Sequence, residues 1–600
     1  MQIQTNRHLV TLATLTLMLA GGCAANSPSQ SSDGAIADSR TLDTSTTDGA
    51  TADQGPLPEY WPLSGDQPKS AELAPLAQAI GSAEVVGLGE ATHGSGGLHR
   101  LRAAAVRHLI ETMNFRLLAF EATWAGAEIA DNYAMAGSCN DTGAQTAVEA
   151  LSHNAWLSAD IRKLLQWICV FNQNHKSDPV RVFGLDIQRP HLHYKAISEF
   201  VEATDWTDKS QLLAGLDKCF GVNFSSAYQV YTSSYAKENV APCYLGMAAL
   251  NKRIDDNATT LSASLGDQAV LRVKIALRAL DGMQQFVDPQ VSETLERRDQ
   301  AMAELFVLGR QRYAASARAI IWASNSHLAR RHELVLRSLD GRAYAAAGQR
   351  SLGGFLAQAL ADKYVAIAAT AGQLGVTHGL RHWTLALDQE PKNFAASLGS
   401  IGPAALVNLR HISPTLWPVG QELGMVFYGH PRYMVPADQF DALLYLKTSD
   451  PMHNAFANGL GGPYIATIAP FKVTTGQRAE TKAVPGDIPI LQISSATKAN
   501  GDSYTWLFRF AQGYVPALNT PLPIDRADRF AVLVNYQAAG QSTVQQFVAL
   551  SGSLTLENWQ YPAKVALRAK NVSFAVVADS RAIIDGPRIH LDEILAEISF

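Results

Sequence analysis

Four short apolar runs in the middle of the chain each end directly on polar side chains of the kinds that carry out catalysis. Longer segments with helical spacing separate these runs. This alternation predicts an α/β domain with a mainly parallel central sheet flanked by helices, and with a helical insertion. The runs and the side chains that follow them are residues 85–89 with Glu90 and His93, 117–120 with Glu121, 180–185 with Asp186, and 319–323 with Ser324, Asn325 and His327.

These four polar sets should lie close together in space, although the chain separates Glu90 from His327 by more than 200 residues. Parallel strands end on one edge of an open α/β sheet, and ligands bind in the crevice outside that edge. The alternative for any single residue is a helix cap, which would account for Asp186 taken alone. Capping does not account for Glu90 with His93 and Glu121. We therefore expect a charged site at this edge.

Two arginines are expected to point toward the same edge. Arg102 falls on the apolar face of the helix predicted over residues 98–113, and Arg298 lies in line with the apolar positions of the segment 293–306. An inward arginine is rarely left buried without a partner, and a carboxylate is its natural bidentate partner. The alternative is a long stem that snorkels past the end of the apolar stripe.

The residue types at this edge suit the activation of water. Paired carboxylates, histidines and an inward arginine can supply a general base, its orienting partner and a cation for a developing oxyanion. Glu and His ligands would also suit a divalent metal. The sequence contains no G-x-S-x-G nucleophile elbow, Walker-type glycine loop or H-E-x-x-H zinc helix. A net charge of −5 without a long basic run argues against nucleic acid as a partner and leaves a small-molecule substrate.

Several ordered blocks resemble the erythromycin esterase family over about residues 60–455. The first block, GLGEATHG, resembles the family's N-terminal signature, and the later blocks follow in the family's order. They are GLGEATHG (87–94), Arg102, AFEATW (119–124), a helix with Trp156, Trp167 and Asn172, FGLDIQ (183–188), RRDQAMAE (297–304), WASNSHLAR (322–330) and FDALLYLKTS (440–449).

The resemblance implies a hydrolase that acts on an ester or lactone, which in the family's named members is a macrolide ring, and that requires no cofactor. Its residues carry over by position to His93 as the general base and Glu90 as its carboxylate partner, with Glu121, Arg102 and His327 lining the same cleft. From their own positions at this edge of the sheet, we expect three further side chains to bind substrate: Asp186, Arg298 and Asn325.

One position departs from the family's pattern. The family has a His-Asn-x-His run in its fourth block, whereas this chain has Ser324-Asn325-Ser326-His327. The departure leaves the substrate open, and we interpret Ser324 as a strand-end cap rather than a replacement nucleophile.

A function of another class is also compatible with these residues. In that alternative the protein is an envelope lipoprotein that holds a metal or a haem without turnover. The ligands would be Glu90, His93, Glu121 and His327. Metal analysis together with an ester panel separates the two functions.

The N-terminus has the pattern of a targeting segment. An apolar stretch over 9–20 is too short to span a bilayer but suits a secretory signal peptide over 1–22. The run LAGGC resembles the lipobox of bacterial lipoproteins, which implies lipidation of Cys23; the alternative is an ordinary cleaved signal. Residues 23–59 are rich in Ser, Thr, Asp and Gly and are expected to form a disordered tether. We therefore expect a lipid-anchored protein of the cell envelope, at the outer membrane or the periplasmic face, whose contact with the membrane is made by the lipid alone.

Two further features concern the cysteines and the C-terminal region. Cys219 and Cys243 flank a polar stretch and could form a disulfide, although connectivity is not readable from sequence.

The segment 456–600 is rich in β-branched residues and in turns, which predicts a smaller all-β, sandwich-like domain. The closing pattern resembles carbohydrate-binding modules, which implies carbohydrate contact; the alternative is an extension that only packs on the catalytic domain.

Overall fold

The computed structural model describes the α/β region and the strands of the C-terminal region. Residues 1–58, which include the predicted signal peptide, Cys23 and the tether, lie outside the described residues. The described residues are 59–452, with gaps at 152–155, 218, 220–234, 289–292, 336–347, 379–380, 391–392, 412–422 and 428–429, and the backbone of eleven strands between 464 and 599.

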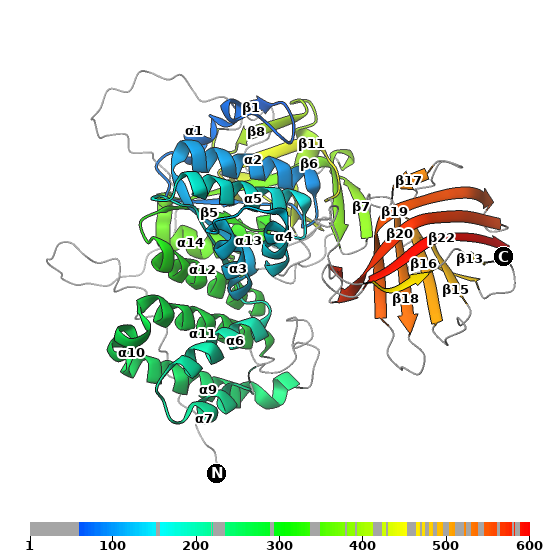
Figure 1. Ribbon diagram of the computed structural model, residues 1–600. Coiled ribbons are helices and arrows are strands. Elements are labelled where there is room, and N and C mark those ends of the chain that lie inside the picture. The colour runs from blue at the N-terminus through cyan, green and yellow to red at the C-terminus, as the bar shows by residue number, and fades with distance from the viewer. Residues whose placement is uncertain are drawn as a thin grey trace, which may run out of the picture. The chain divides into compact units, whose positions relative to one another are not determined.

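A nine-stranded sheet forms the centre of the α/β region (Figure 1). Its order is β1-β8-β11-β6-β2-β5-β3-β4, with β7 paired to β6. The six strands from β11 to β4 in this order pair parallel with one another. The strands β1, β7 and β8 pair antiparallel, so the prediction of a mainly parallel sheet is confirmed. The strands are β1 (Tyr60–Leu63), β2 (Val85–Leu88), β3 (Phe115–Thr123), β4 (Arg181–Asp186), β5 (Arg318–Trp322), β6 (Tyr364–His378), β7 (Arg381–Ala386), β8 (Ala404–Asn408) and β11 (Ala442–Ser449), and β9 (Leu423–Phe427) and β10 (His430–Met434) form a separate hairpin.

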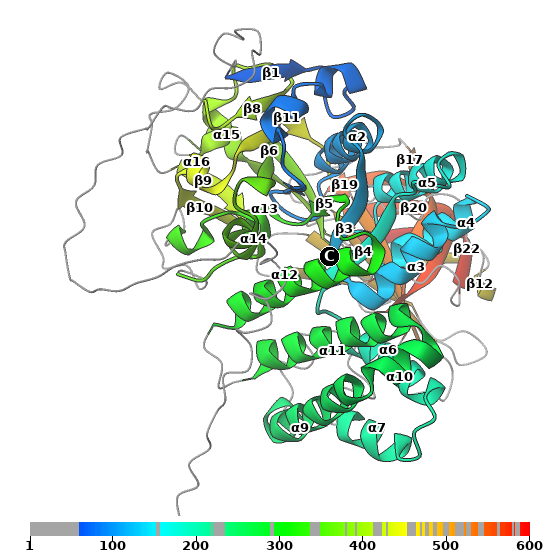
Figure 2. The same cartoon turned by 90° about the vertical axis from the view of Figure 1, so that its left-hand side faces the viewer.

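The four predicted runs are β2, β3, β4 and β5, and they lie side by side in the order β2-β5-β3-β4. The chain moves from β2 to β3 and β4 in one direction, then returns to β5 and β6 in the other. Right-handed crossovers in opposite directions place their helices on opposite faces of a sheet. Accordingly, α2 and α5 lie on one side of the sheet and α12 and α14 on the other (Figure 2). The helices flanking the sheet are α1 (Leu76–Ile80), α2 (Gly96–Met113), α3 (Trp124–Ala134), α4 (Asp141–Ala150), α5 (Ala159–Asn174), α12 (Thr294–Tyr313), α13 (Asn325–Leu328), α14 (Leu352–Leu360), α15 (Phe394–Ser397) and α16 (Pro436–Gln439).

The predicted helical insertion lies between β4 and α12 and is confirmed (Figure 1). A disulfide between Cys219 and Cys243 joins the end of α7 to α9. A second disulfide, which we did not predict, joins Cys139 after α3 to Cys169 of α5. The helices of the insertion are α6 (Pro190–Ala203), α7 (Lys209–Asp217), α9 (Tyr235–Asp256), α10 (Ala258–Leu265) and α11 (Asp267–Val287).

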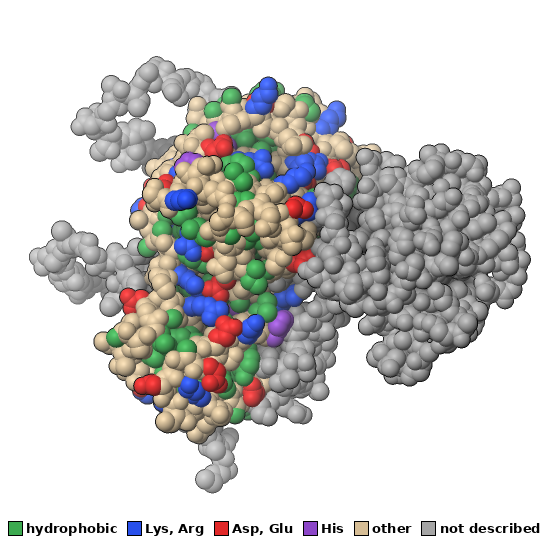
Figure 3. Space-filling model, in the orientation of Figure 1, with side chains coloured by type: hydrophobic (Ala, Val, Ile, Leu, Met, Phe, Trp, Pro, Cys, Tyr) green, Lys and Arg blue, Asp and Glu red, His purple; other side chains and the backbone are tan. Residues whose placement is uncertain are grey.

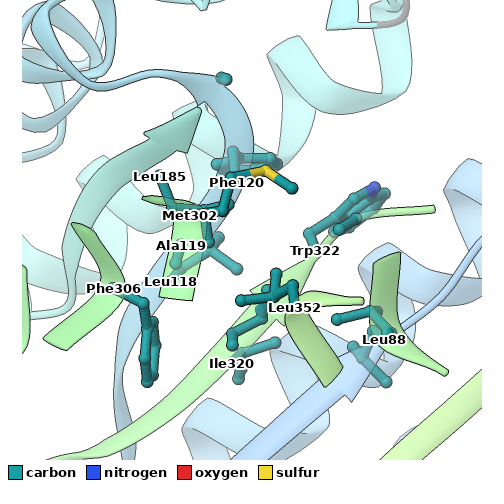
Figure 4. Close-up of a cluster of buried hydrophobic side chains, with 14 of the residues drawn as sticks. Leu88, Leu118, Ala119, Phe120, Leu185, Met302, Phe306, Ile320, Trp322 and Leu352 are labelled. Atoms are coloured by element: carbon teal, nitrogen blue, oxygen red, sulfur yellow. The ribbon is translucent and has the colours of Figure 1, made fainter. Parts of the chain in front are cut away.

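The apolar core fills the space between the sheet and its helices. In Figure 4, Met302 and Phe306 of α12 and Leu352 of α14 lie beside side chains from the strands, among them Leu118 and Ile320. All five side chains are buried. Burying such side chains stabilises the fold by about 1.5–3 kcal/mol each. The core therefore fixes the strands whose ends carry the candidate site.

The helix α2 confirms the predicted helical face. Leu98, Leu101, Ala105 and Leu109 are fully buried, as is Arg102 on the same face. The helix ends at Asn114, which adopts the left-handed conformation that asparagine tolerates at helix ends. An inward Arg102 is therefore confirmed, and a snorkelling stem is not.

In the C-terminal region the elements that the structure describes are all strands, which agrees with the predicted all-β domain, and they pair mostly antiparallel as one sheet of eleven strands. Its division into sandwich layers and its contact with carbohydrate stay predictions. The strands are β12 (Tyr464–Ile468), β13 (Phe471–Val473), β14 (Ala479–Ala483), β15 (Pro489–Ser495), β16 (Ser503–Phe510), β17 (Pro521–Pro523), β18 (Phe530–Gln537), β19 (Gln545–Gln560), β20 (Lys564–Ala578), β21 (Arg581–Ala582) and β22 (Arg588–Ser599).

Two surface properties concern the partners of the protein. On the face shown in Figure 3, basic and acidic side chains of the described residues are interspersed. Among those residues, no helix has the length and apolar composition needed to cross a membrane.

Candidate active site

The first part of the site follows strand β2. Glu90 is completely buried, whereas 16% of the His93 side chain is exposed in the turn before α2. Two backbone hydrogen bonds fix this turn to the sheet: the N–H of Gly89 donates to the carbonyl of Ile367 (2.7 Å), and the N–H of Asn325 donates to the carbonyl of Glu90 (2.8 Å). The base proposed from the sequence is thus held close to a strand end.

Glu90 and His93 form a carboxylate–imidazole pair through Glu90 Oε1 and His93 Nδ1. Burial alone would lower the pKa of His93, but the charge and hydrogen bond of Glu90, together with the charge of Glu121, outweigh burial and raise it. Burial would raise the pKa of Glu90, but the charges of Arg102 and His93 keep it well below its ordinary value. Glu90 is therefore ionised at neutral pH, and its negative charge lies beside the imidazole of His93.

Arg102 is fully buried behind Glu90. Its Nη1 donates to Glu90 Oε2 (2.5 Å), and its Nη2 donates to the carbonyls of Leu88 (2.8 Å) and Ala323 (3.3 Å). Its guanidinium lies 4.0 Å from the centre of the Trp322 ring. Burial lowers the pKa of Arg102 to about 10, so the group stays charged at neutral pH. The carboxylate contact uses one nitrogen, unlike the bidentate pairing we expected, because the other binds the strand ends.

Glu121 lies on β3 and is the central anion of the site. Its Oε1 lies 3.2 Å from Nη2 of Arg298, 3.2 Å from Nε2 of His327 and 3.9 Å from Nε2 of His93. Its Oε2 accepts the backbone N–H of Ser324 (2.9 Å). Burial would raise the pKa of Glu121, but the neighbouring His327, His93 and Arg298 lower it well below its ordinary value.

Arg298 and Asp186 make the bidentate pair of the site. The Nε of Arg298 donates to Oδ1 of Asp186 (3.0 Å), and its Nη2 donates to Oδ2 (2.7 Å). Both residues are buried, although 10% of the Arg298 side chain is exposed. Asp186 also accepts the N–H of Ile187 (2.7 Å). Asp186 is therefore the anchor of an arginine rather than a helix cap alone.

His327 has a carboxylate partner of its own. Its Nδ1 lies 2.7 Å from Oδ1 of Asp299, a buried residue of α12. Its Nε2 faces Glu121 Oε1 (3.2 Å) and Nη1 of Arg298 (3.1 Å). Burial and the charge of Arg298 act to lower the pKa of His327, but Asp299 and Glu121 outweigh them and raise it to about 9.

The side chains of Asn325 and Ser324 bond other parts of the fold, which differs from the substrate binding that we expected of Asn325. The amide of Asn325 is completely buried; its Nδ2 donates to the carbonyl of Ala369 (2.9 Å) and its Oδ1 accepts the N–H of Ala369 (3.1 Å). Asn325 thus joins the end of β5 to β6, in contrast to our expectation that it binds substrate. Ser324 is the N-cap residue of α13, but its Oγ bonds Ser326 Oγ (2.8 Å) and makes no capping hydrogen bond.

Sequence reasoning missed two polar residues at the site, Asp299 and His99. His99 is completely buried, and its Nε2 lies 3.4 Å from Glu90 Oε2 without hydrogen-bond geometry. Helical spacing in the sequence could have placed both residues on a buried helix face. His99 is three residues before Arg102 on the buried face of α2, and Asp299 is three residues before Met302 on that of α12.

The residues at this site suit acid–base chemistry. Two imidazoles each have a carboxylate at Nδ1, and both Nε2 atoms face the same oxygen of Glu121. Two guanidinium groups already neutralise carboxylates that we considered as metal ligands. Among the described residues, no group of three or more His, Cys, Asp or Glu side chains could hold a metal ion.

Comparison with known proteins identifies the family of this chain. The family model of erythromycin esterase matches residues 110–449. A Bacillus subtilis protein provisionally named a hydrolase, YbfO, is 22% identical over 293 residues, which are 46% of this chain and 63% of YbfO. Erythromycin esterase type II of Escherichia coli is 24% identical over 209 residues, which are 35% of this chain and 44% of that protein. The matches thus span less than two thirds of either relative.

A solved structure shares the fold. It is a mutant of erythromycin esterase EreC in its open conformation, which matches with a TM-score of 0.50 and 17% identity over 65% of this chain and 97% of that chain. Since the family model covers more than half of the 600 residues and the fold agrees, this chain belongs to the erythromycin esterase family.

Proposed function

We propose that this protein is a hydrolase that cleaves an ester or lactone of a small or medium organic molecule with water activated by His93. The observation that carries the proposal is the Glu90–His93 pair. Its carboxylate is completely buried, whereas its imidazole is the most exposed of the paired side chains at the site, with 16% of its side chain accessible. A histidine in this arrangement can take a proton from water while its partner stabilises the resulting imidazolium.

The surrounding charges suit the steps of such a reaction. Arg102 binds the oxygen of Glu90 that His93 does not contact and so keeps the carboxylate in place. Arg298 and His93 both face Glu121 Oε1, which brings a partly exposed cation close to the base. Such a cation can stabilise the oxyanion that forms when water adds to the carbonyl.

The substrate class is proposed more broadly than a macrolide. The names of an E. coli relative and of a structural neighbour refer to erythromycin. This chain has Ser324 where the family has histidine, and the fold and base do not define the walls of a substrate pocket. We therefore propose an ester or lactone and include erythromycin among the compounds to test.

The test is a substrate screen with the purified protein. Alkyl esters, aryl esters, lactones and erythromycin are incubated with the wild-type protein and with His93→Ala, and products are identified by the mass of one added water. We expect hydrolysis of at least one compound by the wild-type protein and none above background by the variant. Equal turnover by both proteins, or none by either, contradicts the proposal.

We also propose that the protein acts in the cell envelope with a lipid on Cys23. The support is the lipobox-like run LAGGC and two disulfides, which are typical of oxidising compartments. A palmitate analogue should label the wild-type protein in bacterial cells and should not label Cys23→Ala. Labelling of both proteins, or of neither, contradicts the anchor.

A further inference from the structure

Two carboxylate–imidazole pairs face each other across one oxygen atom. Glu90 contacts Nδ1 of His93, and Asp299 lies 2.7 Å from Nδ1 of His327. The Nε2 atoms of the two rings lie 3.9 Å and 3.2 Å from Oε1 of Glu121. The function proposed above uses only the first pair. The second pair is also buried and hydrogen-bonded, and its role is not explained by that function.

His327 has a partner in place for each of its two protonation states. When Nε2 carries a proton, it can donate to Oε1 of Glu121 at 3.2 Å. When Nε2 is deprotonated, it can accept from Nη1 of Arg298 at 3.1 Å. In both states Nδ1 keeps its proton toward Asp299. A side chain that only supports the fold needs one such partner, whereas a side chain that loses and regains a proton needs both, because an unsatisfied buried polar atom is costly.

The charged groups around His327 favour its protonated form. Asp299 and Glu121 raise its pKa to about 9 against burial and Arg298. His332 of the neighbouring turn interacts electrostatically with both Asp299 and His327, and burial lowers the pKa of His332. The positive charge of His327 in turn acts to lower the pKa of His93, and in such a pair of titratable groups one commonly serves as the acid and the other as the base. His93, with its exposed edge, fits the base, and His327 fits the acid.

We propose that the Asp299–His327 pair is the general acid of this site and protonates the leaving oxygen of the substrate. The inference rests on the proposed function, since it assigns a second step of the same hydrolysis. Asp299 is then a positioning residue that holds the ring and keeps its proton-donating form.

The proton balance of the reaction is complete with these groups. Water adds to the carbonyl carbon while one of its protons passes to Nε2 of His93. The bond from that carbon to the leaving oxygen then breaks, and this oxygen takes the proton from Nε2 of His327. The products are an acid and an alcohol, or a hydroxy acid from a lactone. The proton on His93 returns to His327 through Oε1 of Glu121, which restores the starting state.

The experiment compares two esters of one acyl group that differ in the leaving alcohol. The leaving group of the alkyl ester is a strongly basic alkoxide, which needs a proton from an acid. The leaving group of the p-nitrophenyl ester is p-nitrophenolate, which leaves without one. His327→Gln should lose about 10²–10⁴-fold in kcat on the alkyl ester, the usual contribution of general acid–base catalysis, and less than about tenfold on the nitrophenyl ester. Asp299→Asn should show the same selective loss to a smaller degree.

Controls separate this role from a structural one. His108→Gln removes another buried imidazole, whose Nδ1 contacts Ser70 Oγ rather than a site residue, and should leave the rates on both esters within a few-fold of wild type. Melting curves of all variants report folding. Equal losses of His327→Gln on the two esters would overturn the inference while leaving the proposed hydrolase intact. The acyl group of the two esters is taken from a compound that the wild-type protein hydrolyses in the screen, and failure of the wild-type protein on every compound of that screen would instead count against the proposed function.

A measurement on the wild-type protein covers the case in which the variants do not fold. Because the acid must be protonated, kcat/KM for the alkyl ester should fall as the pH rises through about 9, the pKa of His327. The same limb should be absent for the nitrophenyl ester. A common basic limb for both esters contradicts a general acid at His327.

Discussion

Glu90 and His93 lie only three residues apart, yet one is completely buried and the other opens toward solvent. The strand end holds the carboxylate inside, and the turn before α2 brings the imidazole back over it. Their hydrogen bond joins Oε1 to Nδ1, so Nε2, which lies 3.9 Å from Oε1 of Glu121, is the nitrogen that would take the proton in the proposed reaction. The orientation of the base is therefore set within a single turn of the chain.

Removal of this imidazole should abolish most of the activity without unfolding the protein. We expect His93→Ala to lower kcat by about 10²–10⁴-fold, because the general base is lost while its buried partner keeps Arg102. The measurement is kcat on any ester found in the screen, with a melting curve. His175→Ala, at the end of α5, is the matched control and should behave as wild type. A His93→Ala enzyme within a few-fold of wild type would rule out the assignment.

The pH dependence of the reaction follows from the raised pKa of His93. The base must be neutral, so kcat/KM should fall on acidification below an apparent pKa higher than the ordinary value of about 6.5. Glu90→Gln removes the main charge that raises this pKa, so the acid limb should move to lower pH. Glu111→Gln, an exposed carboxylate of α2, is the control. An acid limb at the same pH in Glu90→Gln and wild type would contradict the pairing.

The raised pKa of His93 also makes the stability of the protein depend on pH, in the direction opposite to that of the activity. A histidine with a raised pKa in the folded state contributes its stability fully below the pKa of the unfolded chain, and this contribution is lost as the pH rises through the folded value. The free energy that His93 and Glu90 add to folding should thus decline in the pH range where the base becomes active. Unfolding by urea over a series of pH values that rises from the ordinary histidine pKa of about 6.5, in wild type and His93→Ala, checks this sign. A pair contribution that grows with pH would contradict it.

The sequence predicted the strand ends well because their signals are local. An apolar run that stops at Glu90, Glu121 or Asp186 can be located without knowledge of the fold, and the parallel sheet then brings the ends together. The buried face of α2 was equally readable, since helical spacing alone places Arg102 inward.

Partners that depend on three-dimensional packing could not be predicted in this way. The pairing of Arg298 with Asp186 joins α12 to β4 across 112 residues of chain. Asn325 was assigned to substrate because its strand-end position is the same as that of the site residues. Its amide instead bonds the backbone of the neighbouring β6, a strand whose place beside β2 no local pattern reveals.

Gly89 should be intolerant of any side chain because Asn325 occupies the space beside it. A Cβ on Gly89 would lie 2.2 Å from Oδ1 of Asn325 and 3.2 Å from the carbonyl oxygen of Ile367. We expect Gly89→Ala to destabilise the protein by about 1–3 kcal/mol, the usual cost of overpacking, in chemical denaturation. Gly137→Ala is the control, since a Cβ there meets no atom within 4 Å. Equal stability of the two variants would mean that the β5–β6 connection is looser than described.

Arg102 should not be replaceable by lysine, although lysine keeps the charge. The guanidinium binds Glu90 through one nitrogen and two strand-end carbonyls through another, over the face of Trp322. A lysine ammonium lacks this planar fork, so Arg102→Lys should lose both stability and turnover. Arg102→Ala leaves a buried carboxylate without its cation, and such a loss costs about 3–5 kcal/mol. Arg331→Lys, on a side chain that is 51% exposed, is the control and should stay within about 0.5 kcal/mol of wild type. If Arg102→Lys melts and turns over like wild type, then the guanidinium geometry does not hold Glu90, and the carboxylate must be fixed by the chain around it.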